Sequence, residues 1–536
     1  MDVVTDLIFT PLGAAICIGV AIFYFVWSSS KDYDIWEKKG VPYVKPKPFF
    51  GSPLHETEVD NYKKYGRLYG SFVGSRPYLS VGDPEHLRNI LVKDFQFFSN
   101  RQGLKTGDKI TERMLQLLEG EDWKRVRTIV TPTFTTGKIK KGSVLSSISH
   151  LLMMSIFTSC SKVLVENFRK YAKSGEAVDS KKIYGAFTMD IIASAAFSTK
   201  LDSHNDPNNE FVQIARSVFH HFNYRFVFYL LVPRIMRFFK VPIFPPKGVK
   251  FFTDVTLRII QERKRTGQKR NDFLQLLMDT ADEIKAEDNI SEKSDGTLNN
   301  YDTETNDQVF KNAQSKKATL TTEELIAQCV IFFLAGFETT ASTLSFVSYY
   351  LALNPDIQDR LVEELDEAVR AGNGELTYEA VQSMKYLDNV ISETLRIHPP
   401  AVRLDRLTGE DYKLGDTGVV IPKDTVVTVP IYAMHRDPDF FPDPETFKPD
   451  RFAAEERSKR NPYTFMPFGA GPRNCVGMRF ALVEVKVSLA YVLSNFRIKR
   501  CPQTKVPLDY MIGQGLLQPK DVTIALEERE NCLLKM

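Results

Sequence analysis

The sequence has few cysteines, and none of them has the spacing of a disulfide framework or a zinc site. The 536 residues contain six cysteines, which lie at Cys17, Cys160, Cys329, Cys475, Cys501 and Cys532. They form no CxxC pair and have no zinc-like spacing to a histidine. This pattern predicts a protein of a reducing compartment without structural disulfides.

The sequence also lacks an excess of either charge. It carries 70 Lys and Arg against 67 Asp and Glu, a net charge of +3, and no segment combines a basic cluster with interleaved aromatic residues. We therefore expect no nucleic-acid partner. Apolar residues are plentiful instead, since 43% of the chain is hydrophobic, including 38 phenylalanines. This is enough for a large core that leaves room for an apolar cavity.

Charge is absent from one long stretch near the N-terminus. The run from Leu7 to Trp27 has no charged residue, and at about 1.5 Å rise per residue a helix of this length spans roughly 30 Å, the thickness of a bilayer core. A cleaved signal peptide is the alternative, but Asp2 and Asp6 stand where it would need basic residues. Lysines follow the run, from Lys31 onward. Residues 1–30 are therefore predicted to be a single-pass transmembrane anchor, with the body in the cytoplasm.

Composition marks two further segments. Four prolines predict a stiff hinge over residues 31–53, followed by the main domain over residues 54–536. Within that domain, the stretch from Asp279 to Asp307 has ten acidic residues against two lysines. It cannot bury enough apolar surface to order itself, so residues 279–318 are predicted to be a mobile loop.

Most of the main domain has a helical period, with short strands between. Tyr78 to Val81 reads as a strand bounded by proline and glycine. A capping box at Thr321 and Glu324, followed by an apolar run that stops at Asn354-Pro355, predicts one helix of about 33 residues. The aromatic and basic region 211–252 is compatible with a membrane contact or with a buried helix pair. The expected fold class is mainly α with small β-sheets (α+β).

One motif has a clear chemical meaning. Cys475 stands just ahead of a predicted helix, where the positive end of the helix dipole favours a thiolate. Gly471 and Gly477 would let a flat cofactor approach the backbone, and Arg473 offers a cation to an acidic group. The alternative is a free cysteine in a glycine-rich turn.

Together with Phe468, these residues form the pattern Phe468-x-x-Gly471-x-Arg473-x-Cys475-x-Gly477, which resembles the haem-binding signature of the cytochrome P-450 superfamily. The resemblance implies the cytochrome P-450 fold, with haem b held by the Cys475 thiolate in a catalytic domain over residues 54–536. Segments such as residues 432–438 look most like the microsomal, drug- and xenobiotic-oxidising clan.

A second constellation lies in the middle of the long predicted helix. Glu338 and Thr339 are polar groups in an apolar helix, and such groups are costly unless they are used or satisfied. Gly336 shares a face with Thr339, which would leave a gap for a small molecule. The alternative is a core helix whose polar groups satisfy backbone or a surface partner. The resemblance implies an oxygen-binding groove, in which Thr339 steadies dioxygen and Glu338 relays protons.

A third constellation joins Glu393 and Arg396, which are three apart on a predicted helix. The resemblance implies that they form a buried network with Arg451. Removing one member would cost roughly 3 to 5 kcal/mol. These three residues are expected to be structural.

Other residues are assigned by the resemblance and by position. It implies haem propionate contacts from Trp123 and Arg127 and from Arg101 and Arg406, the last two having a solvated surface cation as the alternative. By position over the distal haem face, six residues are expected to contact substrate, with a core role as the alternative for each: Phe333, Ala335, Ala401, Val402, Leu404 and Leu516.

The resemblance implies a haem-thiolate monooxygenase that inserts one oxygen atom from O2 into a lipophilic substrate, by hydroxylation or epoxidation. NADPH electrons would arrive through NADPH-cytochrome P-450 reductase, with cytochrome b5 as a second candidate partner, at the endoplasmic reticulum membrane. Candidate reductase contacts are Lys124, Arg125, Lys138, Lys140 and Lys141. Two alternatives are a haem-thiolate isomerase or dehydratase that needs no external electrons, and a membrane haem protein without turnover.

Overall fold

The computed structural model describes residues 33–45, 54–73, 76–103, 107–134, 144–206, 209–231, 236, 238–270, 272–283, 319–511 and 516–534. Helices dominate, and they are α3 (Ile35–Lys38), α4 (Leu54–Tyr65), α5 (Pro84–Arg88), α6 (Lys109–Glu112), α7 (Gly120–Phe134), α8 (Val144–Ser174), α9 (Ser180–Phe197), α10 (Glu210–Leu231), α12 (Pro246–Thr266), α13 (Phe273–Glu283), α15 (Thr322–Leu353), α16 (Pro355–Ala371), α17 (Tyr378–Ser383), α18 (Lys385–Ile397), α19 (Ile431–Met434), α20 (Ala454–Ser458) and α21 (Met478–Asn495). The strands are β1 (Leu68–Val73), β2 (Arg76–Val81), β3 (Val178–Asp179), β4 (Leu404–Leu407), β5 (Tyr412–Lys413), β6 (Val420–Ile421), β7 (Val426–Val429), β8 (Phe496–Lys499) and β9 (Thr523–Glu528). This composition confirms the expected class, mainly α with small sheets.

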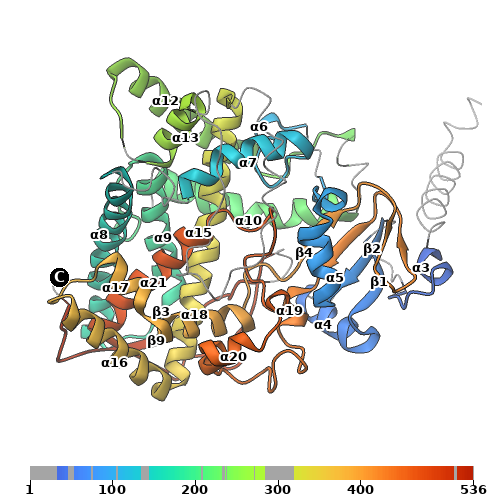
Figure 1. The fold of residues 1–536 in the computed structure, drawn as a ribbon. Coiled ribbons are helices and arrows are strands. Elements are labelled where there is room, and N and C mark those ends of the chain that lie inside the picture. Colours follow the sequence, from blue (N-terminus) through green and yellow to red (C-terminus); the bar gives the residue numbers. More distant parts are fainter. Residues whose placement is uncertain are drawn as a thin grey trace, which may run out of the picture.

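Helix α15 is the spine of the helical part (Figure 1). It has 32 residues, and its first turn is closed by the predicted capping box, in which the Thr321 side chain accepts from the Glu324 N–H and the Glu324 carboxylate accepts from the Thr321 N–H. Among the described residues it is the one helix apolar and long enough to cross a membrane, but 72% of its most apolar window is buried within the fold. Its hydrophobicity therefore serves the core.

The largest sheet lies at the right of Figure 1, beside α4 and α5, and has the strand order β1-β2-β7-β4. Strand β2 contains the predicted Tyr78–Val81 strand and begins two residues earlier, at Arg76. Strand β4 pairs antiparallel with β7 and sets Arg406 opposite Val427. Arg406 thus lies on β4, an edge strand of this sheet.

The N-terminal predictions meet the structure only in part. The predicted anchor, residues 1–30, lies outside the described residues. Residues 33–45 of the predicted hinge pack on the first sheet: Trp36 is fully buried, and a Cβ at Gly70 would stand only 2.3 Å from its ring. This half of the segment therefore belongs to the folded body, because a large aromatic ring is buried there.

The predicted mobile loop begins too early. Its first residues, from Asp279 to Glu283, form the end of α13, and the rest lies outside the described residues. The aromatic region 211–252 is divided between two environments. Phe211 and Phe252 are buried in a core cluster, whereas Phe238 and Phe239 are 80% and 69% exposed.

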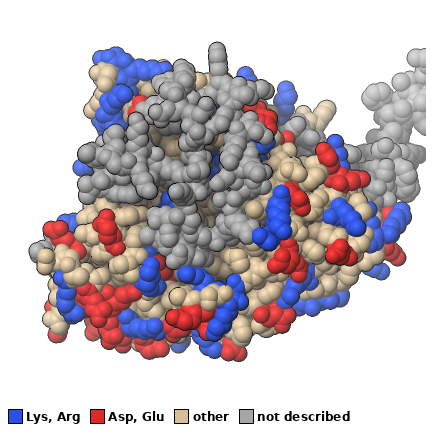
Figure 2. Space-filling model, in the orientation of Figure 1, with Lys and Arg blue, Asp and Glu red and all other residues tan. Residues whose placement is uncertain are grey.

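Charges of both signs cover the visible surface (Figure 2). Acidic side chains gather at the lower left, where α16 lies, and its exposed acids are Asp356, Asp359, Glu363 and Glu367. Basic side chains gather at the upper left, near the end of α12. The charges, nearly balanced in the sequence, are thus partly separated on this face.

Candidate active site

The loop that carries Cys475, here called the Cys475 loop (residues 466–477), is folded onto itself ahead of α21. The Cys475 N–H donates to the Phe468 carbonyl over 2.8 Å, and the Gly469 N–H donates to the Met466 carbonyl over 2.9 Å. Gly477 is the N-cap of α21. The sulfur therefore stands just before the positive end of an 18-residue helix, as the sequence predicts.

The two glycines of the motif have different roles. Gly471 has φ +70, and a Cβ there would lie 2.0 Å from the Leu91 carbonyl oxygen. Close packing against another backbone segment therefore requires a glycine at this position. At Gly477 the nearest atom to an added Cβ is a Phe134 ring carbon at 3.8 Å. This is an ordinary van der Waals distance, so no described atom crowds the position.

Two opposing effects act on the pKa of the Cys475 thiol, and burial, which raises the pKa, is the larger. Desolvation raises its pKa, whereas the Gly477 N–H and the charges of Arg127 and Arg101 lower it. The side chain nevertheless keeps accessible surface, so the sulfur can reach a ligand. A cation bound at the sulfur would offset the desolvation and leave the thiolate as the stable form.

Four predicted arginines gather around this loop. Arg127 donates to the Asn474 carbonyl over 3.1 Å and to its side-chain oxygen over 2.7 Å. Arg101 donates to the Arg473 carbonyl over 3.2 Å. The Arg473 guanidinium lies 4.4 Å from the centroid of the Trp123 ring. Each of these contacts joins the Cys475 loop to a residue more than 300 positions away in the sequence.

Two of these arginines keep buried N–H groups for which the described residues offer no acceptor. They are Nε and Nη1 of Arg473 and Nε and Nη2 of Arg406, on side chains of residues only 3% and 0% exposed. Burial, followed by the charge of Arg101, lowers the pKa of Arg473 to about 8 and that of Arg406 to about 9. Buried cations with unused donors are costly. A ligand with two carboxylates, such as haem with its propionates, fits this site.

The middle of α15 presents a small accessible face. Ala335 is exposed and Thr339 partly exposed, although Leu334, Phe337 and Thr340 beside them are buried. The Thr339 hydroxyl donates to the Ala335 carbonyl over 2.7 Å, which is the back-bond that the sequence suggests. The accessible pair is therefore Ala335 with Thr339, four residues apart on one helix face.

The role expected for Gly336 needs correction. A Cβ at Gly336 would lie 2.7 Å from Cδ1 of Ile192 in α9. The space beside the glycine is thus filled by Ile192, and the missing side chain allows α9 and α15 to pack closely. The gap predicted between Gly336 and Thr339 is reduced to the side of Ala335.

Glu338 has a partner that the sequence did not suggest. Its carboxylate lies 2.9 Å from Nζ of Lys181 in α9. Lys181 also donates to the Pro519 carbonyl over 2.9 Å. The carboxylate is thus tied to two other segments of the fold, and only 9% of the residue is exposed.

The residues nominated for substrate contact fall into two groups. Those with accessible surface are Ala335, Ala401, Leu404 and Leu516. Ala401 and Leu516 form an isolated antiparallel bridge, and the Leu404 side chain lies 3.3 Å from the position of a Cβ on Gly469 in the Cys475 loop. Tertiary structure thus brings three of these residues to contacts that their separation in the sequence does not reveal.

The other two nominated residues are core residues. Phe333 has no exposed surface, and its ring lies 4.7 Å from that of Phe252 and 5.1 Å from that of Phe211. Val402 is 3% exposed and belongs to the main core cluster. For both, the core role considered from the sequence describes the observed surroundings.

Comparison with known proteins decides the family. The family model for cytochrome P450 matches residues 37–525. The chain belongs to the cytochrome P450 family. It is 38% identical to cytochrome P450 3A29 of Sus scrofa over 512 residues, 93% of each chain. It is 37% identical to cytochrome P450 3A13 of Mus musculus over 502 residues, 91% of each chain, and 37% identical to cytochrome P450 3A9 of Rattus norvegicus over 516 residues, 94% of this chain and 93% of the relative.

This cytochrome P450 is a haem-thiolate monooxygenase, an oxidoreductase. The isomerase and the haem protein without turnover, considered from the sequence, are not favoured. The family match agrees with the two features described above, a cysteine just ahead of α21 and buried arginine N–H groups that have no acceptor among the described residues.

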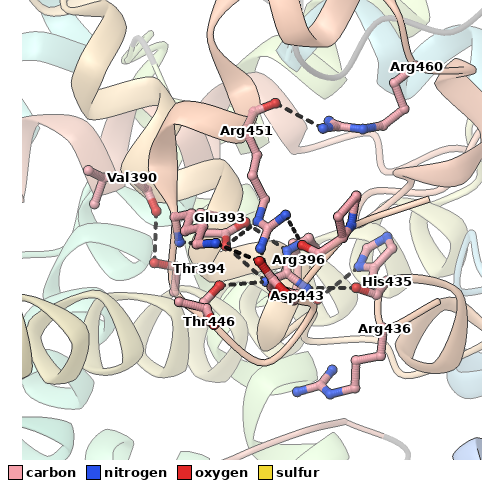
Figure 3. Close-up of polar contacts among 12 residues, drawn as sticks. Val390, Glu393, Thr394, Arg396, His435, Arg436, Asp443, Thr446, Arg451 and Arg460 are labelled. Atoms are coloured by element: carbon pink, nitrogen blue, oxygen red, sulfur yellow. Dashed lines mark hydrogen bonds and ion pairs between the residues drawn. The ribbon is translucent and has the colours of Figure 1, made fainter. Parts of the chain in front are cut away.

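The cytochrome P450 also contains the predicted buried ion network (Figure 3). Arg396 donates to both carboxylate oxygens of Glu393, from Nε over 2.7 Å and from Nη2 over 2.9 Å. Arg451 donates to the same carboxylate over 3.3 Å, and the Lys448 N–H over 2.8 Å. The remaining Arg396 donor, Nη1, reaches the His435 carbonyl over 2.8 Å. The network is therefore closed within the protein.

The sequence did not predict the contacts of three residues at this site, Asn474, Lys181 and His435. Asn474 occupies a variable position of the haem motif, so the pattern carries no signal for it. Lys181 is one of two adjacent lysines at the start of α9, and the sequence does not show which of them points inward. His435 lies within the segment 432–438 that supports the resemblance, where its contacts could not be foreseen.

Proposed function

We propose that the Cys475 thiolate would bind the haem iron and that Arg101, Arg127, Arg406 and Arg473 would hold the haem propionates. One observation carries this proposal, namely the buried N–H groups of Arg473 and Arg406 without an acceptor among the described residues. Haem, when bound, supplies the redox and oxygen chemistry of the reaction. The protein supplies the ligand, the counter-charges and the surroundings.

Thr339 and Glu338 are proposed to hold and move protons next to the bound oxygen substrate. The Thr339 hydroxyl donates a hydrogen bond to the Ala335 carbonyl. Its oxygen lone pairs therefore remain to accept a hydrogen bond from water. Glu338 must leave Lys181 before its carboxylate can take part, because their ion pair holds it on α9. The two residues thus fit the roles of water holder and proton relay.

The substrate contacts are proposed to come from Ala335, Ala401, Leu404 and Leu516, because these nominated residues keep accessible surface. All four side chains are apolar, which suits a lipophilic substrate. Phe333 and Val402 would then act from behind by supporting the shape of this surface.

The partners and the location extend the proposal. Electrons are proposed to come from NADPH through NADPH-cytochrome P-450 reductase, with cytochrome b5 as a second donor, at the endoplasmic reticulum membrane to which residues 1–30 anchor the chain. Of the candidate docking cations, Lys124 and Arg125 are engaged with Glu121 and Glu324. This leaves them less available to a partner, and Lys138, Lys140 and Lys141 lie outside the described residues.

A two-step experiment tests the proposed function. Reduced, folded protein with carbon monoxide is expected to show the red-shifted thiolate Soret band, and Cys475→Ser is expected to lose it. Loss of a lipophilic substrate should then require both NADPH and the reductase. A Thr339→Ala variant should keep the band and consume NADPH with less product. A thiolate band without NADPH-dependent turnover would contradict the monooxygenase roles given to Glu338 and Thr339.

A further inference from the structure

His435 is a buried histidine outside the groups assigned so far. It follows α19 directly, and 1% of the residue is exposed. It lies against the ion network on one side and the start of the Cys475 loop on the other (Figure 3 shows the side toward the network). A polar ring at such a place needs a partner for each nitrogen.

Both ring nitrogens have backbone partners of opposite kinds. Nδ1 lies 3.1 Å from the Arg396 carbonyl oxygen, and the Met466 N–H donates to Nε2 over 3.2 Å. A carbonyl can only accept and an amide N–H can only donate, so the ring is neutral with its proton on Nδ1. Burial, followed by the charge of Arg396, lowers the pKa of His435 to about 3 and keeps the ring in this form.

The contact with Met466 leads directly into the Cys475 loop. The Met466 carbonyl accepts from the Gly469 N–H over 2.9 Å, and the Phe468 carbonyl between them accepts from the Cys475 N–H over 2.8 Å. In the other direction, the His435 carbonyl accepts from Nη1 of Arg396 over 2.8 Å. His435 is thus hydrogen-bonded to the ion network twice and to the Cys475 loop once.

We propose that His435 is a positioning residue. Its Nε2 holds the Met466 N–H, and this contact fixes the position of the Cys475 loop, and thus of the thiolate, relative to the Glu393–Arg396 network. This inference rests on the proposed role of Cys475 as the haem ligand. It assigns His435 a function that packing alone would not require. The ring does contact Phe465 and Phe441, with centroids 5.2 and 6.1 Å away, so the experiment must separate the nitrogen from the ring.

Three substitutions separate the contacts. In His435→Gln the side-chain oxygen can reach the place of Nε2 and accept from Met466, but nothing replaces Nδ1. In His435→Asn the side-chain N–H can replace Nδ1 and donate to Arg396, but the acceptor for Met466 is lost. His435→Phe keeps a ring and loses both bonds. His398→Phe is the matched control, because His398 is also buried, at 3% exposure, and bonds to Tyr350 rather than to the loop.

The readout is the ratio of the thiolate Soret band to the blue-shifted band in the reduced carbon monoxide complex of the haem-loaded protein, measured together with the urea unfolding midpoint. One lost hydrogen bond of about 1 kcal/mol corresponds to a shift of about fivefold in this ratio. We expect that shift in His435→Asn and His435→Phe. We expect a ratio near wild type in His435→Gln and His398→Phe, whatever happens to their midpoints.

Three results would overturn the proposal. They are a wild-type ratio in His435→Asn with a shifted ratio in His435→Gln, band ratios that simply follow the unfolding midpoints across all four variants, and failure of His435→Gln to fold when His435→Asn folds. A wild-type protein without the thiolate band would instead contradict the role of Cys475 itself, before any variant is compared.

Discussion

Two groups of buried arginines in this cytochrome P450 differ in what balances their charge. Arg396 shares the Glu393 carboxylate with Arg451, and its other donors end on backbone carbonyls. Arg473 and Arg406 lie among other arginines and keep N–H groups without an acceptor among the described residues. Within the described residues the first group is complete, and the second group is not.

The difference separates stability from function. A closed ion network needs nothing from outside, so its contribution is to hold α18 against the segment that carries Arg451. A cluster of buried like charges is unfavourable by itself and becomes favourable when a dianion binds. Two buried cations that act on each other and both keep unused donors thus point to an anionic ligand.

Breaking the closed network should have the largest effect. Glu393→Gln removes the negative charge that Arg396 and Arg451 share and leaves both cations buried, at a cost of roughly 3 to 5 kcal/mol in the free energy of unfolding. Urea unfolding of the haem-loaded enzyme measures this. Glu455→Gln, at an exposed acid of α20, is the control and should change stability by less than about 0.5 kcal/mol. Equal losses in the two variants would contradict the buried network as a source of stability.

Breaking the open cluster should reduce haem affinity. Arg473→Met removes a buried cation that the propionates would satisfy. Charge-assisted bonds of about 1.5 to 3 kcal/mol correspond to about ten- to hundredfold faster haem transfer to a scavenger globin.

Added haem distinguishes the two regions. Excess free haem should restore the lost stability of Arg473→Met by mass action, whereas it should leave the defect of Glu393→Gln largely in place. Arg473 also donates to the Leu118 carbonyl over 2.6 Å, so a small part of its loss should persist. A defect of Arg473→Met that haem does not reduce at all would assign Arg473 to structure.

Acid should reduce the free energy of unfolding through His435, which is hydrogen-bonded to the closed Glu393–Arg396 network. Its folded-state pKa is lowered from 6.5 to about 3, so in acid the unfolded chain binds a proton that the folded protein does not. The contribution is fully present above the unfolded pKa and is lost as the pH falls toward 3. Between about pH 7 and pH 5 we expect a loss of about 2 kcal/mol relative to His435→Gln. Parallel stability curves for the two proteins would show that His435 titrates normally.

The smallest expected effect lies outside both arginine groups. Thr321→Ala removes the side-chain acceptor of the α15 capping box and should reduce stability by about 1 kcal/mol. The cap lies at the N-terminus of α15, whereas Thr339 lies in the middle of the helix. The carbon monoxide band ratio and the rate of haem transfer should therefore not change. A change in either would mean that the cap also shapes the haem site.

Local signals made several elements predictable. The capping box and the Asn354-Pro355 stop define α15 because each acts within one turn of the helix. Cys475 at the start of α21 follows from the motif and the apolar run behind it. The pairing of Glu393 with Arg396 follows from their spacing on α18.

Other features were misjudged because they depend on distant residues. The close approach of Leu91 to Gly471 could not be foreseen from the motif. Residues 33–45 were assigned to a hinge, but Trp36 finds a place against Gly70 in β1. The gap expected at Gly336 is filled by Ile192. In each case the deciding atom lies on an element that is remote in sequence.

The sequence by itself determined the thiol that can bind iron, the long helix α15 and the charged residues that the fold buries. Only the tertiary structure decided which charges would be neutralised. Arg396 meets its carboxylate three residues away, within one helix turn. Arg101 and Arg127 reach the Cys475 loop, and the charge of Arg406 acts on Arg473, only because tertiary packing brings distant segments together. Covalent spacing controls the first kind of contact, and the burial of distant apolar surfaces controls the second.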